Sequence, residues 1–362
     1  MEGASALRNT AAEFRFRRKN PTVAVVGLGY WGPNLLRVLI ERTDVDVRWI
    51  CDQDQSRLDR LLRRYPSVAT TQSLDQVLDD PLVDGVLLAT PVYTHYDLAR
   101  RCLEAGKHVF VEKPLAPSTA QATDLIDYST ERELALMCGH TFLYSPPVRA
   151  VKHLIDTEEL GDLYFVSSSR VNLGLHQRDV SVVWDLGPHD FSILLYWMGE
   201  PPSQIRATGR DSIVPGIADV AFVTMEFTSG LIANVELSWL APSKLRRTVI
   251  VGSKKMVVYE DGSAEAIKIY DRGVEYKDPE TFGEWHLSYR SGDIRTPHLP
   301  SEEPLALQMG DFVRAMRTGE LPEHGLALAR DVVRLAEAAD ASLDNGGAQV
   351  ELGDGALVPW AA

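Results

Sequence analysis

The chain has 362 residues, of which 45% are hydrophobic and 24% charged. This is enough for two or more domains with buried cores, and it excludes a disordered, collagen-like or coiled-coil protein. Asp and Glu outnumber Lys and Arg by 51 to 37, giving a net charge of −14. That balance argues against nonspecific nucleic-acid binding, which needs a basic surface. No apolar run reaches the roughly 18–20 residues of a membrane helix, so we expect a soluble protein that acts on small molecules.

The N-terminal residues and the cysteines indicate the compartment. Residues 1–20 are basic but contain no apolar stretch, so they do not resemble a signal peptide. We expect a loosely ordered extension there, with a transit segment as the alternative. Cys51, Cys102 and Cys138 lack the spacing of a zinc site or a disulfide framework. They predict buried free thiols, no metal site and a reducing, cytoplasmic location.

Residues 21–140 alternate short apolar runs with amphipathic segments, which predicts buried strands separated by helices. The expected strands are 22–27, 45–51, 83–89, 109–111 and 134–138, and the expected helices lie around 35–40, 58–65, 94–105 and from 118 onward. Thr94 is expected to cap its helix, with Gly106 just past the end, and Ser118 and Gln121 have the spacing of a capping box. Repeated units of this kind predict a parallel, doubly wound sheet.

Residues 141–362 have a different pattern and are expected to form a second domain. A helix is predicted over 145–155, a strand over 163–171 and a helix within 185–197. From 204 to 276, β-rich runs separated by turn residues predict an antiparallel meander. Helices are expected over 304–317 and 326–343, and the polar segment 277–303 is expected to be a loop.

The sequence Gly27-Leu-Gly29-Tyr30-Trp31-Gly32 directly follows the first strand and opens the first helix. Three glycines in a turn are a weak signal alone, but a strand before and a helix after make them a dinucleotide-binding fingerprint. Gly27 permits the tight turn, Gly29 lets the backbone approach a pyrophosphate, and Gly32 allows close packing of helix and strand. The helix N-terminus then offers free N–H groups to the phosphates. The alternative is a tight turn that holds no ligand.

Asp52, at the end of the second strand, predicts which dinucleotide binds. A carboxylate there accepts hydrogen bonds from the ribose hydroxyls of adenosine and repels a 2′-phosphate, so NAD is favoured over NADP. Arg57 leaves NADP open because a guanidinium nearby can pair with that phosphate.

Further polar residues follow the strands that end near Ala89 and Val111, at the edge where open α/β sheets bind ligands. Thr90, Pro91 and His95 follow the first of these strands and are expected to contact the cofactor, with His95 interpreted as a helix-start residue beside it rather than an acid or base. Glu112 and Lys113 follow the second. Pro114 favours an extended Lys113 whose side chain points out of the sheet, although a solvated loop lysine is the alternative.

In Trp184-Asp185-Leu-Gly187-Pro188-His189-Asp190, Gly187-Pro188 is typical of a helix start. His189 is then expected in the first turn, where the helix dipole favours a neutral imidazole that can act as a general base. Asp185 can orient that ring. Alternatively, Asp185 or Asp190 satisfies backbone donors at the helix start.

Taken together, GLGYWG at 27–32, CD at 51–52, ATPVYTH at 89–95, VEKP at 111–114 and WDLGPHD at 184–190 resemble the Gfo/Idh/MocA family of dinucleotide-dependent oxidoreductases. The resemblance implies an α/β protein: a Rossmann domain, then an α/β domain whose large, open, mostly antiparallel sheet serves as an oligomer interface. It also implies a catalytic trio of Lys113, Asp185 and His189, with Glu112 close to the nicotinamide. The segments 139–146 and 160–174 are similar to members that oxidise a ring hydroxyl of a sugar, often at C3.

We therefore expect an NAD-dependent dehydrogenase that oxidises a secondary hydroxyl of a sugar, nucleotide sugar or glycoside to a ketone, working as a homodimer or homotetramer. A glycosidase acting through transient C3 oxidation, a ketosugar reductase or inositol-type dehydrogenase, and a dinucleotide-sensing regulator are the alternatives. Polar side chains expected to face the substrate, or else to be ordinary strand and loop residues, are His140, Tyr144, Arg170, Asn172 and Arg178.

Overall fold

The computed structural model describes residues 20–174, 180–276, 287–322 and 325–353. The chain divides into two compact units: the residues up to Thr141 together with Glu303–Val333, and Phe142–Glu302 together with the residues from Arg334 onward. Each unit contains one β-sheet and the helices that cover it.

The first unit is built on a six-stranded parallel sheet, sheet A, in the order β3-β2-β1-β4-β5-β6. Strand order reverses at β1 and β4, which makes the sheet doubly wound, as expected, and places a ligand-binding crevice at its carboxyl edge. Its central strands are apolar and buried on both faces. The strands are β1 (Thr22–Val26), β2 (Asp46–Cys51), β3 (Ala69–Thr71), β4 (Gly85–Leu88), β5 (His108–Glu112) and β6 (Leu136–Gly139).

The helices between these strands bury apolar stripes against the sheet. They are α2 (Gly32–Ile40), α3 (Gln55–Arg64), α4 (Leu74–Leu78), α5 (His95–Glu104) and α6 (Thr119–Glu131), and a short 3₁₀ turn, η1 (Val92–Thr94), precedes α5. Ser118 caps α6 by accepting the Gln121 N–H at 3.2 Å, as expected. Thr94 occupies the N-cap position of α5, as expected, but its side chain makes no capping hydrogen bond, and its hydroxyl donates to the Pro91 carbonyl at 2.7 Å. The short elements β3 and α4 are absent from the sequence-based expectation.

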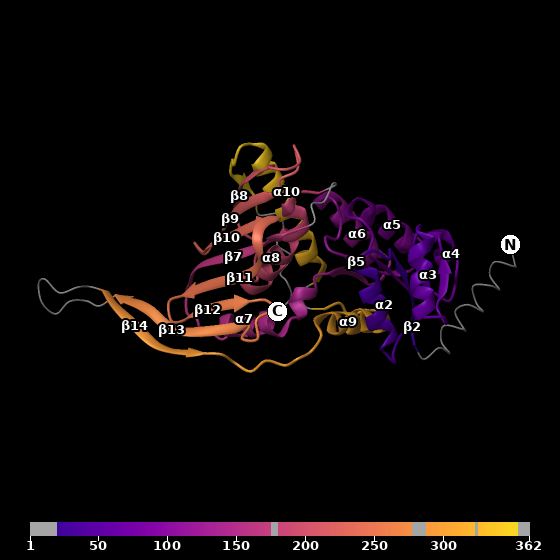
Figure 1. Cartoon of the computed structure of the whole chain (residues 1–362), viewed down its shortest axis with the longest axis horizontal. Helices are drawn as coiled ribbons and strands as arrows, with labels where there is room; N and C mark the ends of the chain where they lie inside the picture. The colour runs from indigo at the N-terminus through magenta and orange to yellow at the C-terminus, as the bar shows by residue number, and fades with distance from the viewer. Residues whose placement is uncertain (1–19, 175–179, 277–286, 323–324, 354–362) are drawn as a thin grey trace, which may run out of the picture. The chain divides into compact units, whose positions relative to one another are not determined.

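Two late helices, α9 (Pro304–Thr318) and α10 (Gly325–Asp344), match the predicted ranges. The sequence-based expectation placed both in the second domain, yet α9 belongs to the first unit, which also takes in α10 as far as Val333. Phe312 of α9 packs edge-on against Phe110 of β5, with 5.7 Å between ring centroids. In Figure 1, α9 lies beside α2, while α5 and α6 lie on the other side of the sheet.

The second unit is built on a nine-stranded sheet, sheet B, in the order β14-β13-β12-β11-β7-β10-β9-β8-β15. All neighbouring pairs are antiparallel except β7 with β10. The predicted meander is therefore two meanders, with β7 inserted between them. The strands are β7 (Leu163–Leu173), β8 (Gln204–Arg210), β9 (Val220–Glu226), β10 (Ile232–Ser238), β11 (Leu240–Gly252), β12 (Met256–Glu260), β13 (Ile267–Tyr276), β14 (Leu287–Arg295) and β15 (Val350–Glu351).

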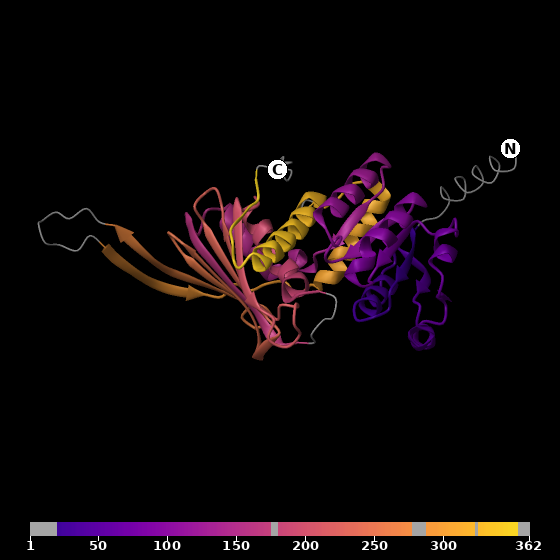
Figure 2. The same cartoon turned by 90° about the horizontal axis from the view of Figure 1, so that it is seen from above.

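Strand β14 contradicts the expectation of a loop over 277–303, of which 277–286 lie outside the described residues. Its residues Ser291–Arg295 are exposed. The segment therefore lacks the apolar alternation that marks a half-buried strand in a sequence. It pairs with β13 through the backbone, and Figure 2 shows the two strands as a ribbon that extends beyond the rest of sheet B.

Helices cover one face of sheet B. These are α7 (Pro146–Asp156), which follows the 3₁₀ turn η2 (Thr141–Tyr144), α8 (Val182–Met198) and the end of α10. Along β9, Ala221, Val223 and Met225 are buried while Phe222 between them is 47% exposed. The alternation shows that the strand has one face toward the core and one open face.

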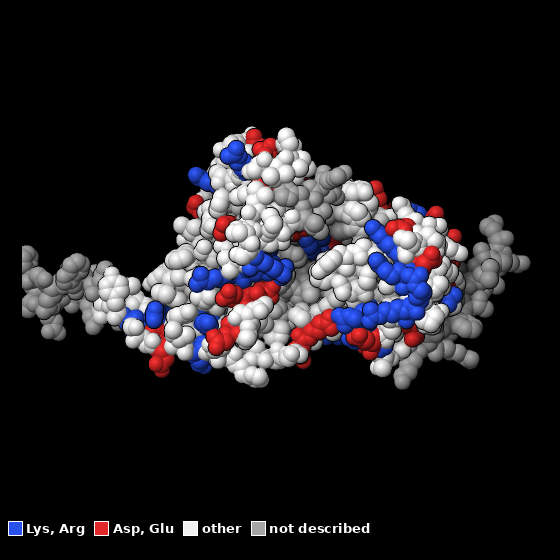
Figure 3. All heavy atoms as spheres, viewed as in Figure 1, with Lys and Arg blue, Asp and Glu red and all other residues white. Residues whose placement is uncertain are grey.

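Within the described residues, no helix is long and apolar enough to span a membrane. The three cysteines are free and buried, as predicted. Burial raises the pKa of Cys51 to about 11 and that of Cys102 to about 12. Figure 3 shows basic and acidic side chains lying next to one another on one face of the molecule, and the structure pairs Arg42 with Asp44 at 2.8 Å.

Candidate dinucleotide and catalytic site

The glycine loop joins β1 to α2, and its three glycines differ in what surrounds them. A Cβ on Gly27 would lie 2.5 Å from the Ala89 carbonyl oxygen, and one on Gly32 would lie 2.0 Å from the Gly27 carbonyl oxygen. Gly27 also has a φ of +87°, which disfavours other residues. A Cβ on Gly29 meets only the Arg57 guanidinium, at 4.0 Å. Gly27 and Gly32 are therefore required by the packing of the protein itself, whereas Gly29 leaves room for a bound group.

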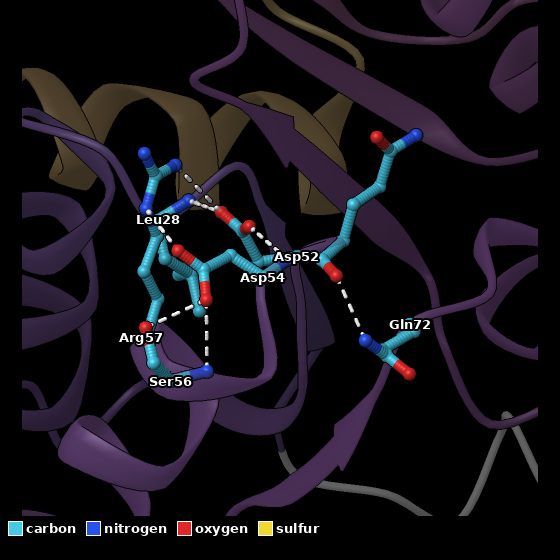
Figure 4. A network of polar contacts seen from close by, with 7 residues as sticks. Leu28, Asp52, Asp54, Ser56, Arg57 and Gln72 are labelled. Atoms are coloured by element: carbon cyan, nitrogen blue, oxygen red, sulfur yellow. Dashed lines mark hydrogen bonds and ion pairs between the residues drawn. The ribbon is translucent and has the colours of Figure 1, made fainter.

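Asp52 follows β2 and is buried beside this loop. Its Oδ2 accepts the Leu28 N–H at 2.6 Å, and its Oδ1 accepts the Asp54 N–H at 2.8 Å (Figure 4). Arg57 contacts the same carboxylate at 3.4 Å and Asp54 at 3.5 Å. Since Arg57 lies beside two carboxylates, its charge is balanced by the protein itself. This arrangement fits the expectation that Asp52 favours NAD over NADP.

The ends of β4 and β5 bring the next predicted residues to the same edge. Thr90 and Pro91 follow β4, Glu112 is the last residue of β5, and Lys113 comes directly after it. The peptide bond between Lys113 and Pro114 is cis. The strands β2, β1, β4 and β5 are consecutive neighbours in sheet A. The predicted residues from the end of β2 to the end of β5 therefore lie along about 14 Å of the carboxyl edge, which is three strand spacings.

Glu112 is a buried carboxylic acid, 6% exposed. Burial raises its pKa to about 7, and the charge of Lys113 opposes that rise. Its Oε1 has no hydrogen-bond donor among the residues that the structure describes. A Cβ at position 139 would lie 2.9 Å from Oε2, so Gly139 at the end of β6 makes room for this side chain.

His95 opens α5, as predicted, and is 1% exposed. Its Nδ1 lies 2.7 Å from the Pro114 carbonyl oxygen and its Nε2 lies 2.9 Å from the Thr90 carbonyl oxygen. Burial lowers its pKa, with a smaller contribution from the charge of Lys113.

In the second unit, the predicted start of the helix that carries His189 is wrong. Helix α8 begins at Val182, and Pro188 lies inside it. Proline has no N–H to donate to the carbonyl one turn back, and α8 continues through this position regardless. His189 is therefore about two turns from the N-terminus, where the dipole argument for a neutral imidazole no longer applies.

Asp185 and His189 are four residues apart on α8, so their side chains lie on one face of the helix. Both are partly exposed. The Asp185 carboxylate also accepts the indole N–H of Trp239 at 3.0 Å. Phe142 packs edge-on against His189, with 5.1 Å between the ring centroids. The trio is thus divided between the units, and the approach of Lys113 to His189 stays a prediction.

Asp190 does not cap a helix start, in contrast to the alternative considered above. It is 4% exposed and forms an ion pair with Arg170 of β7. Its other oxygen accepts the Ser168 hydroxyl at 2.7 Å. The Arg170 guanidinium also lies over the Phe142 ring, 4.7 Å from its centroid, while its Nη1 finds no acceptor among the described residues.

The other predicted substrate contacts come from both units of the chain. His140 and Tyr144 are buried, at 5% and 2% exposure, and Asn172 is partly exposed on β7. Arg178 lies outside the described residues. A substrate role for these residues, and for Arg170, stays a prediction.

Sequence reasoning missed several side chains that support the site. Phe142 and Trp239 contact His189 and Asp185, and Gln308 of α9 donates to the Cys138 carbonyl at 3.2 Å. Each lies far in sequence from the residue it supports or carries no motif of its own. A buried Gln in an amphipathic helix is the one signal that could have drawn attention, because such a group needs partners.

The fold and the carboxyl edge of sheet A define a dinucleotide-binding protein. Residues 22–140 match the family model described as oxidoreductase family, NAD-binding Rossmann fold, and residues 148–258 match the GFO/IDH/MocA C-terminal domain. The chain belongs to the Gfo/Idh/MocA family of NAD-binding oxidoreductases, which confirms the resemblance found in its sequence.

Two curated relatives illustrate the range of the family. UDP-N-acetylglucosamine 3-dehydrogenase of Acidithiobacillus ferrooxidans is 29% identical over 211 residues, which is 58% of this chain and 63% of that enzyme. The match therefore spans less than two thirds of the relative's length. Myo-inositol 2-dehydrogenase of Thermotoga maritima is 25% identical over 327 residues, or 86% of this chain and 97% of that enzyme.

Among solved structures, GenD2 from gentamicin A biosynthesis, in complex with NAD, matches with a TM-score of 0.78 at 27% identity. The match covers 92% of this chain and 97% of GenD2.

The residues of this chain fit NAD as the cofactor. The open space at Gly29 suits a pyrophosphate, and Asp52 suits the adenosine ribose. The Glu112 oxygen that lacks a donor within the described chain lies at the opposite end of the same edge, where the family resemblance places the nicotinamide.

Proposed function

We propose that this protein is an NAD-dependent dehydrogenase that oxidises a secondary ring hydroxyl of a sugar, nucleotide sugar or glycoside to a ketone. The observation that carries the proposal is the position of Lys113, directly beyond β5 on the edge that also presents the glycine loop and Asp52. The names of the 3-dehydrogenase and inositol dehydrogenase relatives support the substrate class.

In the proposed reaction, His189 takes the proton of the substrate hydroxyl. Lys113 donates a hydrogen bond to the same oxygen and stabilises the negative charge that develops on it. Asp185 holds the imidazole in the tautomer that can accept the proton. Bound NAD⁺ would supply the acceptor for the hydride that leaves the carbon bearing this hydroxyl.

The test is a comparison of His189→Asn with the matched change His153→Asn, on the exposed face of α7. A screen of nucleotide sugars, free sugars, glycosides and cyclitols that follows NADH absorbance first identifies a substrate. His189→Asn should then lower kcat by about 10²–10⁴-fold and leave the Kd for NADH unchanged, because a general base acts on the reaction and not on cofactor binding. His153→Asn should match the wild type. A His189→Asn enzyme with wild-type kcat would refute the role of His189.

A second candidate is a reaction with no net oxidation, such as glycoside cleavage through transient oxidation at C3. It is favoured by a relative named 2,7-anhydro-N-acetylneuraminate hydratase in Escherichia coli, 26% identical over 228 residues. The two candidates differ in one readout. A dehydrogenase accumulates NADH in proportion to product, whereas the second reaction releases product without accumulating NADH.

We propose further that the open face of sheet B joins copies of the chain into a homodimer or homotetramer. Phe165 and Ile232 are paired across β7 and β10, and are 45% and 47% exposed. This exposed apolar pair supports an association surface on the open face, where Phe222 of β9 is also exposed. Light scattering of Phe165→Lys beside the wild type tests this, since a charge at this pair should shift the mass toward the monomer.

A further inference from the structure

His95 connects two loops at the carboxyl edge of sheet A. It is the first residue of α5 and is 1% exposed, so water does not compete for its ring nitrogens. One nitrogen faces the carbonyl of Thr90, which follows β4, and the other faces the carbonyl of Pro114, which follows β5. Since β4 and β5 are neighbours in the sheet, the ring bridges the two adjacent turns that carry predicted site residues.

The chemistry of the bridge limits what else His95 can do. Both partners are main-chain carbonyls, which only accept hydrogen bonds, so each bond requires an N–H on the ring. A neutral imidazole supplies one such bond and an imidazolium supplies two. In either state both nitrogens are turned toward the protein backbone, which leaves neither of them directed at a cofactor or a substrate.

The bond to Pro114 has a direct bearing on Lys113. Pro114 is bonded to Lys113, and its carbonyl is the group that the His95 Nδ1 contacts at 2.7 Å. The ring itself is anchored at the start of α5, whose Ala99, Cys102 and Leu103 side chains are buried. The turn after β5 is thereby fixed to a packed helix one residue beyond the lysine.

We propose that His95 is a positioning residue for Lys113, and that its Nδ1–H holds the turn after β5 in place by donating to the Pro114 carbonyl. The inference rests on the proposed function, which gives Lys113 its role in the reaction. It replaces the sequence-based interpretation of His95 as a cofactor contact.

Two conservative variants separate the two contacts. The amide nitrogen of Asn occupies the place of the imidazole Nδ1, and that of Gln occupies the place of Nε2. His95→Asn therefore keeps a donor facing the Pro114 carbonyl, whereas His95→Gln keeps a donor facing the Thr90 carbonyl. The proposal predicts that His95→Asn behaves like the wild type and that His95→Gln does not.

The first readout is independent of the substrate. Acetylation of Lys113 by a soluble acylating reagent is followed by peptide mass spectrometry, with Lys152 on α7 as internal reference. Amide hydrogen exchange over residues 112–118 is measured on the same samples. In His95→Gln both rates should rise several-fold, and in His95→Asn both should stay within twofold of the wild type. Equal rates in all three proteins, or a rise in His95→Asn alone, would overturn the proposal.

The second readout is the Kd for NADH, measured by fluorescence. A positioning role leaves it within about threefold of the wild type in both variants. A loss of NADH affinity in both, with unchanged Lys113 labelling, would show that His95 contacts the cofactor and would overturn the proposal. A failure of the proposed function is seen separately, as wild-type turnover in a variant that lacks the Lys113 amine.

Discussion

The ends of β2 and β5 each carry a buried carboxyl group, and their surroundings give the two groups different chemistry. Asp52 receives backbone N–H groups from Leu28 and Asp54 and lies beside Arg57. Glu112 is equally buried, yet its Oε1 lacks a donor among the described residues and its pKa is raised to about 7. The comparison teaches that burial alone does not decide the role of an acid. Donors make Asp52 a fixed binding group, while their scarcity leaves Glu112 able to gain or lose a proton near neutral pH.

Of the changes at the ends of β2 and β5, we expect the largest effect from one at β5, and we expect it on kcat rather than on cofactor binding. Lys113→Met removes the ammonium group beside Glu112 and should lower kcat by about 10²–10³-fold, the loss typical of one donor to a developing charge. The Kd for NADH should change little. Steady-state kinetics and fluorescence titration measure the two quantities, and Lys244→Met on β11, at an exposed position, is the control. A large loss of NADH affinity with normal kcat would place Lys113 in the cofactor site only.

A smaller effect, on binding alone, is expected at the end of β2. Asp52→Asn keeps the shape of the side chain, removes its charge and replaces one of the two oxygens that accept backbone N–H groups by an NH2 group. Hydrogen bonds to charged groups contribute about 1.5–3 kcal/mol. We expect the Kd for NADH to rise by about 10–100-fold, while kcat at saturating NAD stays unchanged. The ratio of the Kd for NADPH to the Kd for NADH should fall. Asp54→Asn is the matched control, because Asn also caps a helix well and should preserve α3. Equal NADH affinity in Asp52→Asn and Asp54→Asn would contradict the ribose role.

A third expected effect, which leaves the reaction and cofactor binding aside, concerns the pH dependence of stability at the end of β5. The Glu112 pKa is about 7 in the folded chain against an ordinary value of 4.5, so the fold favours the protonated form. Between these pH values the native state binds more protons than the unfolded state, and stability falls as pH rises. Relative to Glu112→Gln, the wild type should lose up to about 3 kcal/mol of unfolding free energy between pH 4.5 and 7.5. Urea denaturation at several pH values measures this, with exposed Glu104→Gln as control. Parallel pH profiles for Glu112→Gln and the wild type would be incompatible with a raised pKa.

Sequence reasoning located the doubly wound sheet because its strands are uniformly apolar and because each glycine of the loop meets its own steric requirement. Gly27, Gly32 and Asp52 lie where the motif requires them. It failed where local signals compete with tertiary packing. Gly187-Pro188 is typical of a helix start, yet α8 begins at Val182 and continues through the proline, with Val182 and Val183 buried before it.

The same limit explains the missed strand and the misplaced helix. Strand β14 has few buried side chains, so its pairing with β13 leaves no periodic trace in the sequence. Helix α9 is amphipathic, but amphipathicity does not say which sheet the apolar face will cover. Tertiary contacts assign it to sheet A, among them the contact of Phe312 with Phe110 and the hydrogen bond from Gln308 to Cys138.

The return of Glu303–Val333 to the first unit means that neither unit is a continuous stretch of polypeptide. Within the described residues, the chain passes from one unit to the other after Thr141, after Glu302 and after Val333. Truncation after Gly139 would strip α9 from sheet A, leaving the Phe110 ring without its neighbour and the Cys138 carbonyl without its donor. Any chimera that exchanges the NAD-binding half of this enzyme must therefore carry the distant helical segment along with it.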